Sequence, residues 1–280
     1  MNFGYLIIIS NTGAHDYFKM AEALCYSIKV TQKSGYSKVA LVVDNLSKIR
    51  AENETTSMFD HVIEWNEETF WNGRNYMDQL SPFDYTVCLD ADMLFTEDHS
   101  QWIDYFVDNC DLYVANKSYT FKGSVVTEDY YRKAFRDNNI PDLYSFYTFF
   151  KKNKSICNDF FDLGRIILKN PIEFSSIYFS KRRPKILGTD EIFSLSAKIL
   201  DIEDQIAYPL SFPRVAHIKP MIQNWNLQAD KVSDIVGFYL NDQGKLKIGN
   251  YQQQNIVHYV EKDFITEDIL EIYRSRYYGH

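Results

Sequence analysis

The stretch Phe83-Asp84-Tyr85-Thr86-Val87-Cys88-Leu89-Asp90-Ala91-Asp92-Met93-Leu94-Phe95 decides the fold that this sequence predicts. Residues 86–89 are a short apolar and β-branched run, which predicts a buried strand of an α/β sheet. Two carboxylates, Asp90 and Asp92, follow this strand directly. Burying either of them inside the strand without a partner would be costly. We therefore place both at the carboxyl end of the strand, where open α/β sheets bind ligands.

Asp90 and Asp92 are two residues apart, so on an extended chain their side chains point the same way, with Cα atoms about 6–7 Å apart. The pair has three interpretations: an acidic turn without a chemical role, a structural calcium loop, or a site for a divalent cation shared with substrate phosphates. A helix-loop-helix calcium site needs a central Gly and a downstream Glu, which this segment lacks. We favour the cation site and keep the acidic turn as its alternative.

Residues 85–94, in which an apolar strand leads into Asp90-Ala91-Asp92, resemble the strand-then-DxD signature of nucleotide-sugar glycosyltransferases with the GT-A fold. The glycogenin and lipopolysaccharide galactosyltransferase type is the most similar. The resemblance implies an α/β fold with a Rossmann-like mixed sheet flanked by helices. It also implies transfer of a hexose or pentose from a nucleoside-diphosphate sugar, with UDP as the nucleotide and Mn²⁺ or Mg²⁺ as the cofactor, and retention of the anomeric configuration.

The chain before the Asp-Ala-Asp segment alternates strand and helix patterns. Residues 5–9 are a continuous apolar run, as expected of a buried parallel strand, and we predict them to be the first, central strand. Apolar residues at helical spacing over residues 17–30 predict the helix that follows. Residues 39–43 and 61–65 predict the second and third strands. This order implies right-handed crossovers and a parallel sheet in which residues 86–89 form the fourth strand.

The composition of the 280 residues, with 45% hydrophobic residues and only 11 Gly and 7 Pro, predicts one compact domain without a flexible linker. We divide it into a donor-binding half at residues 1–116 and an acceptor-binding half at residues 117–280. The four cysteines lack metal-type spacing and predict reduced thiols in a cytosolic protein. The N-terminal apolar run is too short for a signal core or a membrane span, so we predict a cytoplasmic protein without a membrane span.

The charge is unevenly distributed: residues 117–185 hold 14 Lys and Arg against 7 Asp and Glu, whereas residues 1–116 hold 7 against 18. Basic residues interleaved with aromatic ones favour a polyanion-binding face; the alternative is a solvated surface beside an aromatic core. The Tyr-, Phe- and Lys-rich chain is also similar to bacteriophage glycosyltransferases that modify hydroxymethylated pyrimidines in DNA. Two acceptors therefore remain open: a modified base flipped out of phage DNA, in the host-cell cytoplasm, and a carbohydrate chain.

The resemblance also implies residues that contact the donor. In the family the loop after the first strand contacts the base and the ribose, which implies Asn11 and Thr12 here; a plain helix-capping turn is the alternative. The helix before the DxD strand often places a basic residue near the phosphates or the sugar. Arg74 and Asp78 are the candidates on that helix.

Three acidic residues resemble those that line the sugar pocket of the family. Residues 157–168 are polar and aromatic at first and then apolar, which predicts a pocket-lining segment with Asp159 followed by a strand. Thr189 is a predicted N-cap, and Asp190-Glu191 stand where family members carry an Asp-Gln pair that faces the donor sugar. We assign Asp159, Asp190 and Glu191 as catalytic residues. For the last two, a favourable interaction with the helix dipole is the alternative.

Two histidines near the end of the chain resemble the His and Lys-Pro pattern of the family. His217 precedes Lys219-Pro220, and His258 ends a short apolar run with Lys262 one turn later. We predict His258 as the imidazole ligand of the metal, with His217 as the alternative ligand or a contact to donor or acceptor. Lys219 and Lys262 are the matching candidates for the diphosphate.

Two other classes of protein share parts of this pattern. A glycoside hydrolase also needs two carboxylates, but they flank the scissile bond, whereas Asp90 and Asp92 project from one strand end. A non-catalytic nucleic-acid-binding protein would explain the basic region and leave the Asp-Ala-Asp segment unexplained. The sequence therefore favours the glycosyltransferase.

Overall fold

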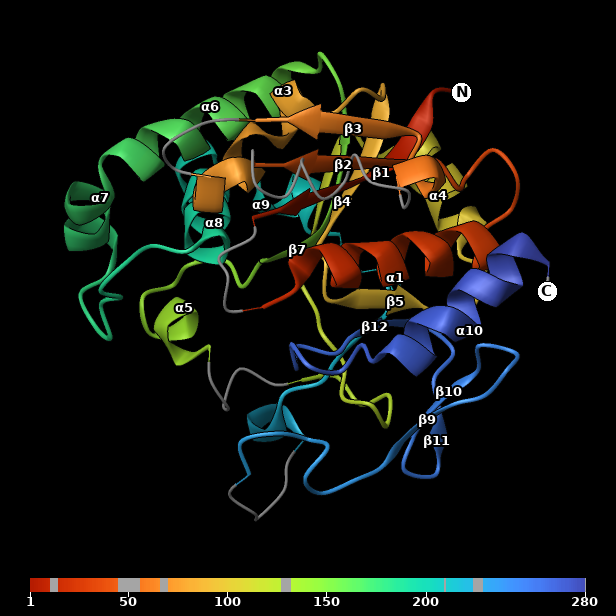
Figure 1. The fold of residues 1–280 in the computed structure, drawn as a ribbon. Helices are drawn as coiled ribbons and strands as arrows, with labels where there is room; N and C mark the ends of the chain where they lie inside the picture. Colours follow the sequence, from red (N-terminus) through yellow and green to blue (C-terminus); the bar gives the residue numbers. More distant parts are fainter. Residues whose placement is uncertain are drawn as a thin grey trace.

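A six-stranded mixed sheet forms the centre of the molecule (Figure 1). The computed structural model describes residues 1–10, 15–44, 56–65, 70–126, 132–208, 210–223 and 229–279. In spatial order the strands are β3 (His61–Glu64), β2 (Val39–Val43), β1 (Phe3–Ile9), β4 (Tyr85–Leu89), β7 (Tyr144–Lys151) and β6 (Leu112–Ala115). The first four are parallel, whereas β7 is antiparallel to β4 and β6. The four predicted parallel strands and the interior position of β1 are confirmed.

The strands β1, β2 and β4 are apolar on both faces because each face of the sheet is covered by helices. Ile7 and Val87 belong to a core shared with α1 (Tyr17–Thr31) and α4 (Ser100–Asn109). Their neighbours Leu6 and Cys88 belong to a second core shared with α6 (Ser155–Lys169) and α8 (Thr189–Leu200). Successive side chains of a strand point to opposite faces, so a strand buried on both faces needs an unbroken apolar run. The mixed α/β architecture predicted from the sequence is therefore confirmed (Figure 1).

The remaining helices are short, except the C-terminal one, which packs against α1 (Figure 1). They are α3 (Met77–Leu80), α5 (Lys133–Asp137), α7 (Pro171–Tyr178), α9 (Glu203–Ile206) and α10 (Glu267–Tyr278), with 3₁₀ turns η1 (Thr56–Met58), η2 (Phe70–Tyr76) and η3 (Pro220–Ile222). Among the described residues, no helix has the length and apolar character needed to cross a lipid bilayer.

Two small sheets complete the fold. One contains β9 (Phe238–Leu240), β10 (Leu246–Ile248) and β11 (Tyr251–Gln252), and the other contains β5 (Met93–Phe95), β12 (Ile256–His258) and β8 (Val215–His217). In the second sheet β12 lies in the middle, antiparallel to β5 and parallel to β8. Because β5 directly follows the Asp-Ala-Asp segment, this sheet brings the C-terminal part of the chain to the end of β4.

The expectation of a strand near residue 168 was wrong. Residues Ser155–Lys169 form the single helix α6, in which Phe160, Gly164 and Ile167 are buried at helical spacing. The apolar run at residues 166–168 is only the last turn of this helix. Conversely, the aromatic segment Tyr144–Lys151 is a strand, and β7 lies between β4 and β6. The central sheet therefore takes strands from both sides of residue 116.

Gly4 of β1 has no side chain, and the ring of Phe83 fills the space that a side chain would occupy. A Cβ atom at Gly4 would lie 2.3 Å from this buried ring, so Gly4→Ala forces one of them to move. We expect Gly4→Ala to lower the free energy of unfolding by about 1–3 kcal/mol, the usual range for overpacking. Chemical denaturation measures this change.

The control is the double variant Gly4→Ala/Phe83→Leu. The smaller side chain makes room for the new methyl group, so the double variant should lose less stability than the sum of the two single changes. Additive losses would mean that the Phe83 ring does not set the cost of a side chain at Gly4.

Candidate metal centre

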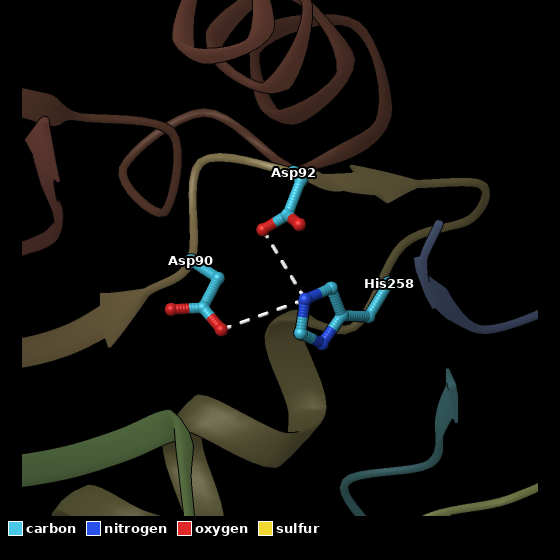
Figure 2. A group of neighbouring side chains, drawn as sticks. All are labelled: Asp90, Asp92 and His258. Atoms are coloured by element: carbon cyan, nitrogen blue, oxygen red, sulfur yellow. Dashed lines mark ion pairs between the residues drawn. The ribbon is translucent and has the colours of Figure 1, made fainter. Parts of the chain in front are cut away.

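Two carboxylates and one imidazole converge at the carboxyl end of β4 (Figure 2). Asp90 follows the last residue of β4, Asp92 precedes β5, and His258 is the last residue of β12. The Nε2 atom of His258 is 3.5 Å from an Asp90 oxygen and 3.2 Å from an Asp92 oxygen. One ligand atom from each residue lies within 4.8 Å of the other two. The three side chains can therefore face one small cation together.

Backbone pairing sets this convergence. His258 pairs with Met93 across the β12–β5 ladder, and the N–H of Tyr259 donates to the carbonyl of Asp92 at 3.1 Å. Pairing of β12 with β5 therefore places residue 258 beside the segment that carries both carboxylates, although more than 160 residues separate them in the chain.

Each carboxylate also has a cationic neighbour. Arg74 forms an ion pair with Asp90 and donates from Nη1 to the carbonyl of Ser145 at 2.8 Å. The Nζ atom of Lys262 is 2.5 Å from the second oxygen of Asp92. Burial alone raises the pKa of Asp92, but the neighbouring His258 and Lys262 outweigh it and hold this pKa well below its ordinary range. Asp92 is therefore an ionised carboxylate although its residue is only 5% exposed.

A cavity of about 340 Å³ opens over the three residues. Its lining includes Ser10 and Tyr17 from the start of the chain, Arg74, and the two lysines Lys219 and Lys262. Burial lowers the pKa of Lys219, and Asp190 and Asp92 oppose this effect. Asn11 and Thr12, expected to contact the base and ribose, lie outside the described residues, directly after the cavity-lining Ser10.

Val260 lies between the two C-terminal site residues and lines the cavity. Its φ of 64° is unusual for a β-branched residue, because the Cβ substituents crowd the backbone in this conformation. Such strain persists only where the surroundings hold the chain in place, and it is common at ligand sites. The bend at Val260 lets the chain present both His258 and Lys262 to the same cavity.

His217 lies behind His258 and is not part of the carboxylate cluster. The Nδ1 atoms of the two rings are 3.0 Å apart, and His217 is 3% exposed. Burial, with smaller contributions from His258 and Lys219, holds the pKa of His217 well below its ordinary value. His217 is therefore a neutral imidazole that contacts His258.

Asp190 belongs to a polar network that adjoins the cavity. Its two oxygens accept hydrogen bonds from the backbone N–H of Ser145 at 2.8 Å and from Nη1 of Arg132 at 2.7 Å. Burial raises the pKa of Asp190, but Arg132 and Ser145 lower it more. The backbone carbonyl of Ser145 also accepts a hydrogen bond from Arg74. Ser145 therefore links Asp190 to the Arg74–Asp90 pair.

The other expected acidic residues lie elsewhere. Glu191 accepts the N–H of Gly188 at 3.0 Å, which caps α8, so the helix begins one residue after Gly188 rather than after the predicted N-cap Thr189. Burial and the nearby Asp190 raise the pKa of Glu191. Asp78 pairs with Arg165 at 2.8 Å. Asp159 is exposed on α6 and is not among the residues that line the cavity.

Comparison with solved structures identifies the architecture. Mouse xyloside xylosyltransferase 1, in its apo form, matches 79% of this chain over 88% of its own length, with a TM-score of 0.55 and 9% sequence identity. The chain has a GT-A glycosyltransferase fold. GlyE of Streptococcus pneumoniae TIGR4 is 14% identical with a TM-score of 0.41, covering 73% of this chain and 44% of GlyE. The apo WbbM bifunctional glycosyltransferase is 15% identical with a TM-score of 0.42, covering 75% and 46%.

The chain thus spans less than half the length of the GlyE and WbbM structures. No protein-family model matches the chain, and no curated protein is similar to it in sequence.

Within this GT-A fold the three converging side chains suit a hard or borderline divalent cation. Two carboxylates and one imidazole supply oxygen and nitrogen ligands, which Mn²⁺ accepts and Mg²⁺ accepts when oxygen predominates. The ionised state of Asp92 adds the negative charge that such a cation needs. The residues therefore fit the metal that the sequence predicts.

No sequence pattern singles out Arg132, which holds Asp190. Arg132 lies between Asp190 and Asp142 and stacks over the rings of Phe135 and Tyr144, with both ring centroids about 4 Å away. A single Arg in a basic segment carries no spacing signal. Only the folded chain shows that its charge is buried beside two carboxylates.

We expect Arg132→Met to lower the free energy of unfolding by roughly 3 kcal/mol, because it leaves a half-buried carboxylate without its cation. The pKa of Asp190 is lowered in the folded state, so its ion pair contributes fully above the ordinary Asp pKa of about 4 and is lost as the pH falls. Stability measured between pH 7 and pH 3 should therefore fall less steeply in the variant than in the wild type.

Arg136→Met is the matched control, because Arg136 pairs with Asp137 at the surface with 42% of its side chain exposed. It should change stability by no more than about 0.5 kcal/mol. Equal losses in both variants would contradict the role of Arg132 as the buried partner of Asp190.

Proposed function

We propose that the protein is a metal-dependent glycosyltransferase that moves a sugar from a nucleoside-diphosphate sugar, with UDP as the nucleotide, to a hydroxyl of a carbohydrate acceptor. The observation that carries this proposal is the convergence of Asp90, Asp92 and His258 in one cavity of a GT-A fold. A cation with carboxylate ligands beside basic side chains is the arrangement that binds a diphosphate.

The charges around the cavity support a diphosphate ligand. Among the residues that line the cavity, Asp90 and Asp92 carry two negative charges, and Arg74, Lys219 and Lys262 carry three positive charges. A divalent cation and a diphosphate of charge about −2 cancel each other, so they can enter together without adding net charge to this partly buried site. Lys262 and Lys219 are the donors we assign to the phosphate oxygens.

Bound Mn²⁺ or Mg²⁺ would neutralise the charge that develops on the diphosphate as it leaves the sugar. The ligands for this ion are Asp90, Asp92 and the Nε2 atom of His258. The protein itself contributes by positioning: Arg74 fixes Asp90 against the backbone of Ser145, and the cavity walls hold the donor.

We assign Asp190 to the orientation of the donor sugar. Its oxygens accept hydrogen bonds from Ser145 and Arg132, and a carboxylate has further lone pairs that can accept a sugar hydroxyl. The side chain of Glu191 caps α8 through the N–H of Gly188, so its assignment to the sugar pocket rests on the sequence resemblance alone. Asn11 and Thr12 remain our candidates for the base and ribose. The proposed role of Asp159 rests on the sequence resemblance alone.

A carbohydrate acceptor agrees with the charge distribution better than DNA does. Part of the positive charge of residues 117–185 is paired with carboxylates within the fold. Lys151 and Lys154 pair with Asp111, Arg165 pairs with Asp78, and Arg182 pairs with Asp137. The structurally similar mouse protein is by its name a xylosyltransferase of a xyloside. DNA stays a prediction of the sequence without support from these contacts.

We expect Asp92→Asn and Asp90→Asn to reduce transfer at least about 100-fold, because each removes a charged ligand while nearly keeping the volume. Release of UDP from a panel of UDP-sugars, with Mn²⁺ or with EDTA, measures the reaction. Asp108→Asn, an exposed carboxylate on α4, is the matched control and should retain wild-type activity. Full turnover in EDTA, or full activity of both site variants, would contradict the proposal.

For the acceptor, we expect no binding of duplex DNA at 150 mM salt and transfer to an oligosaccharide hydroxyl. The control variant is Arg182→Ala/Arg183→Ala/Lys185→Ala, which should leave transfer unchanged. DNA binding that weakens steeply with salt, with a flatter slope in this triple variant, would instead favour the DNA acceptor.

A further inference from the structure

Two buried imidazoles meet beneath the proposed metal site, with their ring planes inclined by 71°. His217 ends β8 and His258 ends β12, and the parallel register pairs them directly. Their Nδ1 atoms are 3.0 Å apart, which is a hydrogen-bond distance. On the opposite side of its ring, the Nε2 atom of His258 faces Asp90 and Asp92 (Figure 2).

The protons of this pair can be assigned by counting. A neutral imidazole carries one N–H and one acceptor nitrogen, so only one of the two facing Nδ1 atoms holds a proton. A metal on Nε2 of His258 needs that nitrogen unprotonated, which puts the proton of His258 on Nδ1. Nδ1 of His217 must then accept, and the proton of His217 lies on Nε2, which is buried without a partner among the described residues.

We propose that His217 is a positioning residue that accepts the Nδ1–H of His258 and so aims the Nε2 lone pair of His258 at Asp90 and Asp92. This inference rests on the proposed metal site. Ligand histidines usually donate their second N–H to a carboxylate or a carbonyl, and that partner fixes both the ring orientation and the tautomer. Here a neutral imidazole has this role, and it adds no further negative charge to a site that already holds two carboxylates.

The surroundings keep His217 in place for this role. Its ring stacks on Phe146, with centroids 5.9 Å apart and planes 22° apart, and Phe146 also contacts the ring of His258. The backbone N–H of His217 donates to the carbonyl of Tyr119 at 2.8 Å, and its backbone carbonyl accepts a hydrogen bond from Nε2 of Gln223 at 3.0 Å. With its ring and its backbone both held, His217 can constrain the ring of His258.

Three substitutions of His217 separate the hydrogen bond from simple packing. In His217→Asn the amide oxygen takes the place of Nδ1 and can still accept the hydrogen bond from His258. In His217→Gln the amide is one methylene further from the backbone, so its oxygen takes the place of Nε2 instead. His217→Leu keeps an apolar volume and has no acceptor. Calorimetry measures the affinity of each variant for Mn²⁺ in the presence of UDP. We expect the affinity of His217→Asn to stay within about 3-fold of the wild type, and those of His217→Gln and His217→Leu to weaken about 10-fold or more.

A second measurement needs no variant of His217. Long-range ¹H–¹⁵N correlation of the wild-type protein with Mg²⁺ and UDP should show His258 protonated at Nδ1 and His217 protonated at Nε2. Thermal unfolding of each variant shows whether it has kept its fold. If a variant has not, the tautomers of His217 and His258 in the wild type test the inference instead. The opposite tautomers would overturn the inference.

The outcomes also distinguish this inference from the proposed function. If the wild type binds no Mn²⁺ even with UDP, the proposed metal site fails, and the inference fails with it. If His258→Ala loses the metal while all three folded His217 variants bind it as the wild type does, only the inference fails. Equal weakening in the Asn and Leu variants would also overturn it, because the acceptor would then not matter.

Discussion

The site depends on one backbone interaction, the pairing of β12 with β5. This ladder joins the end of the chain to the segment that leaves β4, and it places His258 opposite Met93. Without it the two carboxylates would face the cavity without the imidazole or Lys262. The pairing is stabilised because Leu94, Val257 and their neighbours are buried in the core that also contains α1. The hydrophobic effect thus holds a polar site in place.

Burial of charge limits which side chains can surround this ladder. Asp92 and Arg132 are almost fully buried, and each is placed against opposite charge. Removing one member of such a pair would leave a charge with little solvent, which is more costly than never burying it. The series of polar contacts from Asp90 through Arg74 and Ser145 to Asp190 therefore acts as one unit. It connects the proposed metal ligands to the carboxylate that we assign to the donor sugar.

Much of the fold could be predicted because local patterns and burial agree. The apolar runs of β1, β2 and β4 are buried on both faces, and only a layered α/β fold covers both faces. The prediction failed for α6, where a polar and aromatic segment hides a helical stripe, and it did not find β7. An aromatic strand inserted between β4 and β6 is a non-local pairing, so no neighbouring residues signal it.

The sequence by itself determined the parallel strands and the place of Asp90 and Asp92 at a strand end, because strand periodicity and the cost of burying charge are local. It also limited the candidates for the predicted imidazole ligand to His217 and His258. Only the tertiary structure decided that His258 faces the carboxylates and that His217 lies behind it, since this follows from the register of β12 against β5 and β8. The partner of Asp190, Arg132, was likewise decided by packing alone. Contacts between distant segments depend on how the layers close, and no spacing within the chain encodes that.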